Sequence, residues 1–252
     1  MSKAVIVGGG AAGMAAAVFL AEKGHTVHLF EKNEKLGKKI YITGKGRCNF
    51  TNACPQEELF DNIIHGRKFL YSAFYGYNNF DVIDFFESLG VRTKTERGNR
   101  VFPRSDHASD ITLALEKRMK ALDVTIHLKT EVTEVLASDG QIRGISLKDG
   151  SLIQADAVLV ATGGLSYPST GSTGDGYRFA RSLGHQVTPL CPSLVPFLTQ
   201  EDYIPLMQGL SLKNVSLTLF RKNKKCWDGF GELLFTHRGI SGPLALTASA
   251  QI

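Results

Sequence analysis

Three glycines near the N-terminus constrain this chain more than any other feature of its sequence. Residues 3–7 (KAVIV) form a short β-branched run that predicts a buried strand, and residues 11–23 carry helix formers. Between them and into the helix lie Gly8, Gly10 and Gly13, in Gly-x-Gly-x-x-Gly spacing. A strand, a glycine-rich turn and a helix in this order are the context in which that spacing binds the pyrophosphate of a dinucleotide.

The second expected strand, residues 26–31 (TVHLFE), ends in an acidic residue. A carboxylate at Glu31 accepts hydrogen bonds from the adenosine ribose and disfavours a 2′-phosphate, so the dinucleotide is FAD or NAD rather than NADP. The following sequence favours FAD, because residues 33–54 form a basic loop instead of continuing in βαβ units. In addition, the apolar strand 156–162 ends in Ala-Thr, followed by two glycines, and flavoproteins of the glutathione-reductase type approach FAD at such a strand.

The middle of the chain alternates between helical and strand patterns. We expect helices over 56–90, 109–122 and 175–183, and short strands over 91–103 and 124–154. Ser109 or Asp110 is the expected N-cap of the second of these helices, and Asp175 that of the third.

The character of the sequence changes after about residue 190. Three prolines punctuate the chain there, and alternating segments follow on both sides of a basic turn, RKNKK (221–225). The sequence therefore predicts an α/β fold in two parts. These are a Rossmann-like FAD-binding domain over residues 1–190 and the start of an inserted β-rich substrate or cap domain over residues 191–252.

Composition narrows the class of protein. Of the 252 residues, 43% are hydrophobic and 21% are charged, which excludes wholesale disorder. Four cysteines in no zinc or CxxC spacing predict no metal site and a reducing, cytoplasmic compartment. No apolar run is long enough to cross a membrane without interruption.

The net charge is +5, and the positive charge is concentrated in residues 31–47 and 221–225. Two basic stretches leave open a nucleic-acid-associated flavoprotein, for example an RNA-modifying enzyme. No basic surface interleaved with aromatic residues is evident in the sequence, so we disfavour nucleic acid as a partner.

Four motifs carry a more specific resemblance. They are GGGAAG (8–13), GKKIYITGKGRCNFTN (37–52), ATGGLSYPSTGSTGDGY (161–177) and GELLFTHRGISGP (231–243). With them the chain resembles, over nearly its whole length, the BaiN/YhiN-like family of bacterial FAD-dependent oxidoreductases, also described as NAD(FAD)-utilising dehydrogenases or aminoacetone oxidases. The resemblance implies hydride transfer between a small organic substrate, or NAD(P)H as electron donor, and N5 of the flavin.

The resemblance also implies which residues hold FAD. The first motif would bind the pyrophosphate, Glu31 would bind the adenosine ribose with Lys32 beside it, and the backbone of Val132 would meet adenine. The basic loop would run along the pyrophosphate and isoalloxazine, and the Ala-Thr-Gly-Gly turn would close on the cofactor. The positions implied are Gly8, Gly10, Ala12, Gly13, Glu31, Lys32, Lys38, Lys39, Gly44, Gly46, Arg47, Cys48, Asn49, Val132, Thr162, Gly163 and Gly164.

Three residues are candidates for a catalytic role, each with a plain alternative. Arg47 would stabilise an anionic reduced flavin, or it forms a salt bridge that holds its loop. Cys48 would react as a thiolate, but we favour a packing role because no partner cysteine is spaced for exchange. His237 would face the substrate from the second domain, or it is a polar residue at the end of a strand.

The resembled family continues well past Ile252, the last residue here. We therefore expect this chain to be part of a longer or split enzyme, with weak FAD binding and low activity by itself. A non-catalytic FAD-binding fragment that needs a further segment or a second chain remains the other interpretation.

Overall fold

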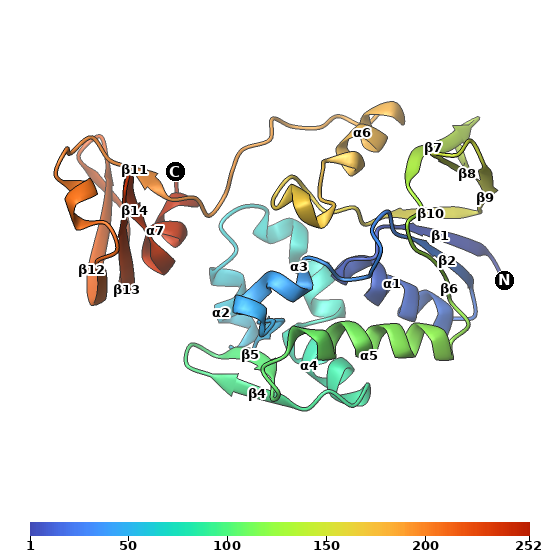
Figure 1. Ribbon diagram of the computed structural model, residues 1–252, viewed down its shortest axis with the longest axis horizontal. Helices are drawn as coiled ribbons and strands as arrows, with labels where there is room; N and C mark the ends of the chain where they lie inside the picture. Colours follow the sequence, from blue (N-terminus) through green and yellow to red (C-terminus); the bar gives the residue numbers. More distant parts are fainter. The chain divides into compact units, whose positions relative to one another are not determined.

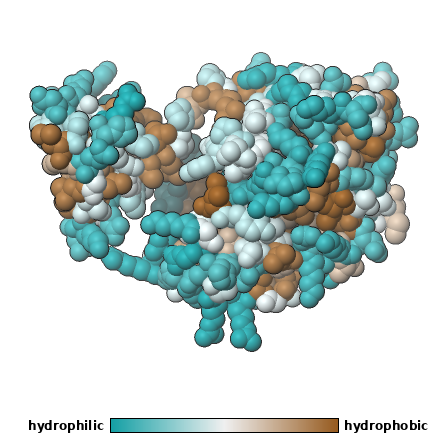
Figure 2. All heavy atoms as spheres, in the orientation of Figure 1, coloured by the Kyte–Doolittle hydropathy of each residue, from teal (hydrophilic) through white to brown (hydrophobic).

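The computed structural model describes all residues from 1 to 252 and divides into two compact units (Figure 1). The larger unit contains residues 1–59 and 69–187, and the smaller contains residues 60–68 and 188–252. Figure 2 shows a face of the larger unit on which hydrophilic and apolar residues are interspersed. None of the helices is both long and apolar enough to cross a lipid bilayer.

A four-stranded parallel sheet forms the centre of the larger unit, in the order β10-β1-β2-β6. Helix α1 joins β1 to β2, which makes the βαβ unit expected from the glycine motif. The strands and the helix are β1 (Lys3–Val7), α1 (Ala11–Glu22), β2 (Thr26–Phe30), β6 (Thr125–His127) and β10 (Ala157–Val160).

Alternate residues of the central strands enter two separate cores. On one face Ile6 and Leu29 pack with Met14 of α1 and with Leu115 and Met119 of α5 (Ala108–Ala121). All five side chains are fully or almost fully buried. Each such side chain contributes about 1.5–3 kcal/mol through removal from water, so this layer fixes α1 against the sheet.

An antiparallel three-stranded sheet covers the other core, where Val135 and Ile145 pack with Val5, Phe30 and Phe179. Its hairpin turns at Asp139-Gly140, and both residues have positive φ (54° and 73°), as the two-residue turn requires. The strands are β7 (Val132–Ser138), β8 (Gln141–Leu147) and β9 (Leu152–Gln154), followed after β10 by α6 (Asp175–Ser182).

The segment that follows the basic loop differs from the sequence expectation in detail. Residues 56–90 form three short helices instead of one helical stretch, because Gly66 has a positive φ and Asn78 begins a new helix with a capping box. The elements are η1 (Ile40–Gly46), β3 (Thr51–Asn52), α2 (Gln56–Asp61), α3 (Arg67–Gly76), α4 (Asn79–Ser88), β4 (Thr93–Glu96), β5 (Arg100–Pro103) and η2 (Pro168–Thr170).

Two expected helix caps are wrong. His107 rather than Ser109 or Asp110 is the N-cap of α5, and its side chain makes no capping bond. Gly174 is the N-cap of α6, which leaves Asp175 as its first helical residue. Both carboxylates have other partners, since Asp110 accepts from the hydroxyl of Ser105 and Asp175 accepts from Lys32.

The smaller unit contains a four-stranded antiparallel sheet in the order β11-β14-β13-β12, with α7 packed on β13. The basic stretch 221–225 lies at the tip of the long β12–β13 hairpin, as expected from the sequence. The elements are β11 (Phe197–Leu198), η3 (Ile204–Met207), β12 (Ser211–Arg221), β13 (Lys224–Thr236), β14 (Gly239–Ser241) and α7 (Gly242–Ser249).

Candidate functional site

A cavity of about 350 Å³ opens where the carboxyl ends of β1 and β2 meet the start of α1. In parallel α/β sheets this edge is where ligands bind. Its walls come from the glycine turn, the loop after β2, the start of β7 and the turn after β10. The segment 170–175 before α6 completes the wall.

Gly13 and Gly10 of the first motif have different surroundings, so a side chain at each position would have a different effect. A Cβ at Gly13 would overlap the carbonyl oxygen of Gly8, so only glycine lets the helix approach the turn this closely. A Cβ at Gly10 would instead meet nothing within 4 Å. Gly10 is the N-cap of α1 with no side-chain capping bond, and the first turn of the helix carries no acidic residue. The open space at the positive end of the helix therefore suits an anion.

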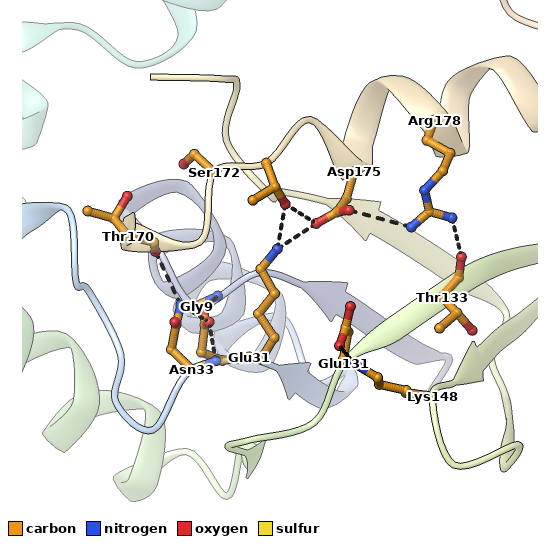
Figure 3. A network of polar contacts seen from close by, with 12 residues as sticks. Gly9, Glu31, Asn33, Glu131, Thr133, Lys148, Thr170, Ser172, Asp175 and Arg178 are labelled. Atoms are coloured by element: carbon orange, nitrogen blue, oxygen red, sulfur yellow. Dashed lines mark hydrogen bonds and ion pairs between the residues drawn. The ribbon is translucent and has the colours of Figure 1, made fainter. Parts of the chain in front are cut away.

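Glu31 follows β2 directly and is buried at 8% exposure. One carboxylate oxygen accepts from the backbone N–H of Gly9 at 2.7 Å. The other accepts from the backbone N–H and side-chain amide of Asn33 at 2.8 and 2.7 Å, as Figure 3 shows. The carboxylate thus joins the glycine turn to the loop after β2 and fixes the geometry of this wall.

Residues 166–175, which we call the strap, cross the same wall and are held by three side chains. The ammonium of Lys32 donates to Asp175 and to the Thr173 hydroxyl, each at 2.7 Å. Lys39 donates to the Ser166 carbonyl at 2.8 Å and to the Ser172 hydroxyl at 2.7 Å. The amide of Asn33 donates to the Thr170 carbonyl at 3.2 Å (Figure 3).

Opposing effects set the charge of Asp175. Burial raises the pKa of its carboxyl, but hydrogen bonds from Lys32 and Thr173 and the charge of Lys32 outweigh burial and hold the pKa below its usual value. The carboxylate is therefore ionised at neutral pH and neutralises Lys32. Lys39 has no carboxylate within ion-pair distance, so its positive charge remains available to an anion in the cavity.

The structure brings ten of the expected cofactor-binding residues to the cavity wall. They are Gly8, Gly10, Ala12, Glu31, Lys32, Lys38, Lys39, Val132, Thr162 and Gly163. Sequence reasoning missed Asn33, Thr170 and Ser172 as wall residues. Their signal in the sequence is weak, because Asn33, Thr170 and Ser172 are ordinary polar residues of loops.

Seven expected residues lie outside the cavity wall. Gly13 and Gly164 adjoin wall residues, whereas Gly44, Gly46, Arg47, Cys48 and Asn49 form the loop that continues from Thr43, itself a wall residue. In this loop Lys45 and Cys48 both have φ of 59°, in the left-handed region, so the backbone turns sharply at both residues.

Arg47 belongs to an ion-pair network. Its guanidinium lies 2.9 Å from Glu96 and 3.2 Å from Asp106, and it stacks 4.2 Å from the centroid of the Phe102 ring. Lys94 pairs with the same two carboxylates. Hydrogen bonds from Arg47 and Lys94 hold the pKa values of Glu96 and Asp106 below their usual range despite partial desolvation. This arrangement matches the structural alternative for Arg47.

Cys48 is buried at 5% exposure, and burial raises the pKa of its thiol despite a hydrogen bond with Thr43. A raised pKa disfavours the reactive thiolate. Asn49, in the amide orientation that satisfies it, donates to the Thr51 and Val101 carbonyls. His237 lies exposed in the turn between β13 and β14 of the smaller unit.

The residues present fit a dinucleotide. Thr162 lines the cavity, and its hydroxyl is buried next to Gly176 with no hydrogen-bond partner in the protein. An unpaired buried hydroxyl costs about 1–3 kcal/mol. The open position at Gly10 and the ammonium of Lys39 offer space and charge for a diphosphate on the same wall.

Comparison with known proteins places this geometry in context. A family described as "HI0933-like protein Rossmann domain" matches residues 2–242. Ribosomal RNA dihydrouridine synthase of Haemophilus influenzae is 35% identical over 98% of this chain and 61% of its own length. The 3-dehydro-bile acid delta(4,6)-reductase of Clostridium scindens is 34% identical over 96% of this chain and 58% of its own length. The chain thus spans about three fifths of these curated relatives.

Solved structures agree on the fold. The 3-ketosteroid-Δ4-(5α)-dehydrogenase of Rhodococcus jostii superimposes with a TM-score of 0.57 at 14% sequence identity. The match covers 84% of this chain and 60% of that protein.

Proposed function

Because this chain belongs to the HI0933-like family of Rossmann-domain proteins, we propose that it is the FAD-binding part of a flavin-dependent oxidoreductase. Its reaction transfers a hydride between flavin N5 and a small organic substrate or NAD(P)H. The single observation that carries the proposal is the cavity at the glycine turn, with Thr162 and the uncompensated Lys39 ammonium on its wall.

Family membership confirms the resemblance drawn from the sequence, and with it the Rossmann-like FAD-binding fold and FAD as the cofactor of the family. We propose further that the expected residues hold FAD in a set order. Glu31 would hold the adenosine ribose and Val132 would hold adenine. Gly10 and Ala12 would hold the diphosphate, and Lys39 would offset its charge.

The loop of residues 44–49, which continues from the wall residue Thr43, would hold the isoalloxazine end. When bound there, FAD supplies hydride acceptance and donation at N5 of its ring. The chain's own residues position the cofactor, and Arg47 acts by fixing the loop through Glu96 and Asp106. Cys48 supports the same loop by packing.

The names of the two curated relatives suggest a substrate class. A dihydrouridine synthase reduces the ring double bond of uracil, and a 3-dehydro-bile acid delta(4,6)-reductase acts on ring double bonds of a 3-oxo steroid. In both compounds the double bond is conjugated with a carbonyl group, which makes one carbon electrophilic enough to accept a hydride. We propose an alkene conjugated with a carbonyl as the substrate class of the whole protein.

Reoxidation of the reduced flavin tests this class. The FAD-loaded chain is reduced photochemically without oxygen and mixed with a cyclic enone or with the corresponding saturated ketone. The proposal expects the enone to restore the oxidised flavin spectrum and the saturated ketone to leave the flavin reduced. Equal rates with both compounds would overturn the substrate class.

A second candidate substrate is uridine within ribosomal RNA. A relative at 35% identity carries that name, and the exposed tip of the β12–β13 hairpin presents Arg221, Lys222, Lys224 and Lys225. Formation of dihydrouridine in ribosomal RNA treated with the reduced protein, detected by mass spectrometry, supports this candidate. RNA left unchanged under conditions in which the enone is reduced overturns it.

We also propose that residues 191–252 belong to an inserted β-rich domain that contributes to the substrate site, with His237 available on its surface. The proposal expects brief proteolysis to cut within the segment between α6 and β11, leaving FAD on the larger product. The sparse, unpaired cysteines support a reducing, cytoplasmic compartment.

A further inference from the structure

A second pocket in the larger unit lies between the end of α4, the β4–β5 hairpin and the start of α5. Its volume is about 540 Å³. It shares no wall residue with the dinucleotide cavity. Two arginines line it, Arg92 and Arg104, together with the apolar side chains of Leu89, Val91 and Leu113.

The two arginines form a cross-strand pair of like charge. Thr93 pairs with Pro103 at the end of the antiparallel β4–β5 ladder. One step beyond, the N–H of Arg104 donates to the carbonyl of Arg92 at 2.8 Å, so these residues lie directly opposite each other. Opposed residues have Cβ atoms about 4.5–5.5 Å apart, and like charges in that position are destabilising.

The pocket wall holds one carboxylate, Asp110, and it forms no ion pair with either arginine. Neither guanidinium has an ion-pair or side-chain hydrogen-bond partner, and the nearby Asp110 accepts instead from the Ser105 hydroxyl at 2.6 Å. Lys94 on the same hairpin differs from the two arginines, because it forms ion pairs with both Glu96 and Asp106. The fold therefore neutralises one cation of the hairpin and leaves two others opposed at a pocket.

We propose that this pocket binds a phosphate ester, with the two guanidinium groups on either side of one phosphate and the attached group against Leu89 and Leu113. Guanidinium groups form paired, charge-assisted hydrogen bonds with phosphate oxygens. Leu113, which is 56% exposed, gives the attached group an apolar surface to cover. This inference does not depend on the flavin chemistry proposed above.

Two kinds of ligand carry such a phosphate ester. They are an RNA, with its phosphodiester backbone, and a free nucleotide, with its phosphate monoester. The test measures binding of a short fluorescein-labelled oligouridylate to the full chain by fluorescence anisotropy, and binding of uridine 5′-monophosphate separately by calorimetry. Arg92→Gln and Arg104→Gln each remove one guanidinium and are expected to weaken binding about tenfold. Arg97→Gln removes an exposed arginine of the same hairpin that does not line the pocket, and serves as the matched control.

Loss of oligouridylate binding alone identifies the RNA backbone as the source, and loss of both ligands identifies the monoester. Unchanged binding of both ligands in the Arg92→Gln and Arg104→Gln variants would overturn the proposal. An equal effect of Arg97→Gln would do so as well, because it would indicate attraction to diffuse positive charge.

Thermal unfolding of the ligand-free chain gives an independent readout. Either substitution relieves the repulsion, so the midpoint is expected to rise, whereas Arg97→Gln leaves it unchanged. A fall of the midpoint in both pocket variants would contradict the opposed-charge arrangement on which the proposal rests.

Discussion

The ammonium of Lys32 lies 2.7 Å from the carboxylate of Asp175 and ties the loop after β2 to the start of α6. The two residues are 143 positions apart in the chain. Both are about three-quarters buried, with side-chain exposures of 27% and 23%. This pair closes the strap of residues 166–175 along the wall of the dinucleotide cavity, so it links the fold of the larger unit to retention of its ligand.

Opening the strap is therefore expected to speed loss of FAD. Asp175→Asn removes the ion pair but keeps the shape of the side chain, and FAD release should accelerate about fivefold, the upper range for a partly exposed pair. Stopped-flow fluorescence of released flavin measures the rate. Lys32→Gln should have a similar effect, and the double variant should be no faster than either single variant, because both remove one interaction.

The same pair predicts an acid limit for FAD retention. The folded pKa of Asp175 lies below its usual value of 3.8, so the ion pair is intact above that value and is lost as the pH falls through the lowered pKa. FAD release should be independent of this group between about pH 5 and pH 7 and accelerate only in stronger acid. Asp175→Asn should lack that acid step. A step near neutral pH that disappears in Asp175→Asn would contradict the assignment.

The cysteines predict a simple pattern of reactivity. Cys191 and Cys226 are exposed, whereas Cys48 and Cys54 are buried and burial raises the pKa values of both thiols. A disulfide reagent should label two thiols in the native chain and four after unfolding in denaturant. Rapid native labelling of Cys48, identified by peptide mapping, would revive its interpretation as a reactive thiolate.

The two interpretations of Arg47 predict different effects of substitution on the thermal midpoint and on the flavin reduction potential. If it holds its loop through Glu96 and Asp106, Arg47→Gln lowers the thermal midpoint, and Glu96→Gln does the same. The reduction potential of bound flavin then stays close to that of the wild type in both variants. A potential that shifts in Arg47→Gln but not in Glu96→Gln would instead indicate direct action on the flavin.

The sequence predicted the βαβ unit and most of the cavity wall because these depend on local pattern. Glycine spacing, an apolar run and an acidic strand tip such as Glu31 are readable without tertiary structure. The strap was not predicted, because Lys32 and Asp175 meet only through the sheet order that places β10 beside β1. The caps at His107 and Gly174 were missed since Asp110 and Asp175 have tertiary partners that outweigh their capping preference.

The most direct test of the central claim is the FAD that the purified chain binds at equilibrium, measured as the excess of flavin absorbance on the protein side of a dialysis membrane, because the chain alone is expected to bind FAD weakly. Gly10→Val and Gly76→Val make a matched pair, since a Cβ at either position meets nothing within 4 Å and neither glycine needs a positive φ. Of these two glycines, only Gly10 lines the cavity. The account predicts excess flavin absorbance near about 450 nm with the wild type and with Gly76→Val, and none with the folded Gly10→Val variant. Equal flavin binding by Gly10→Val would contradict binding of the FAD diphosphate at this turn.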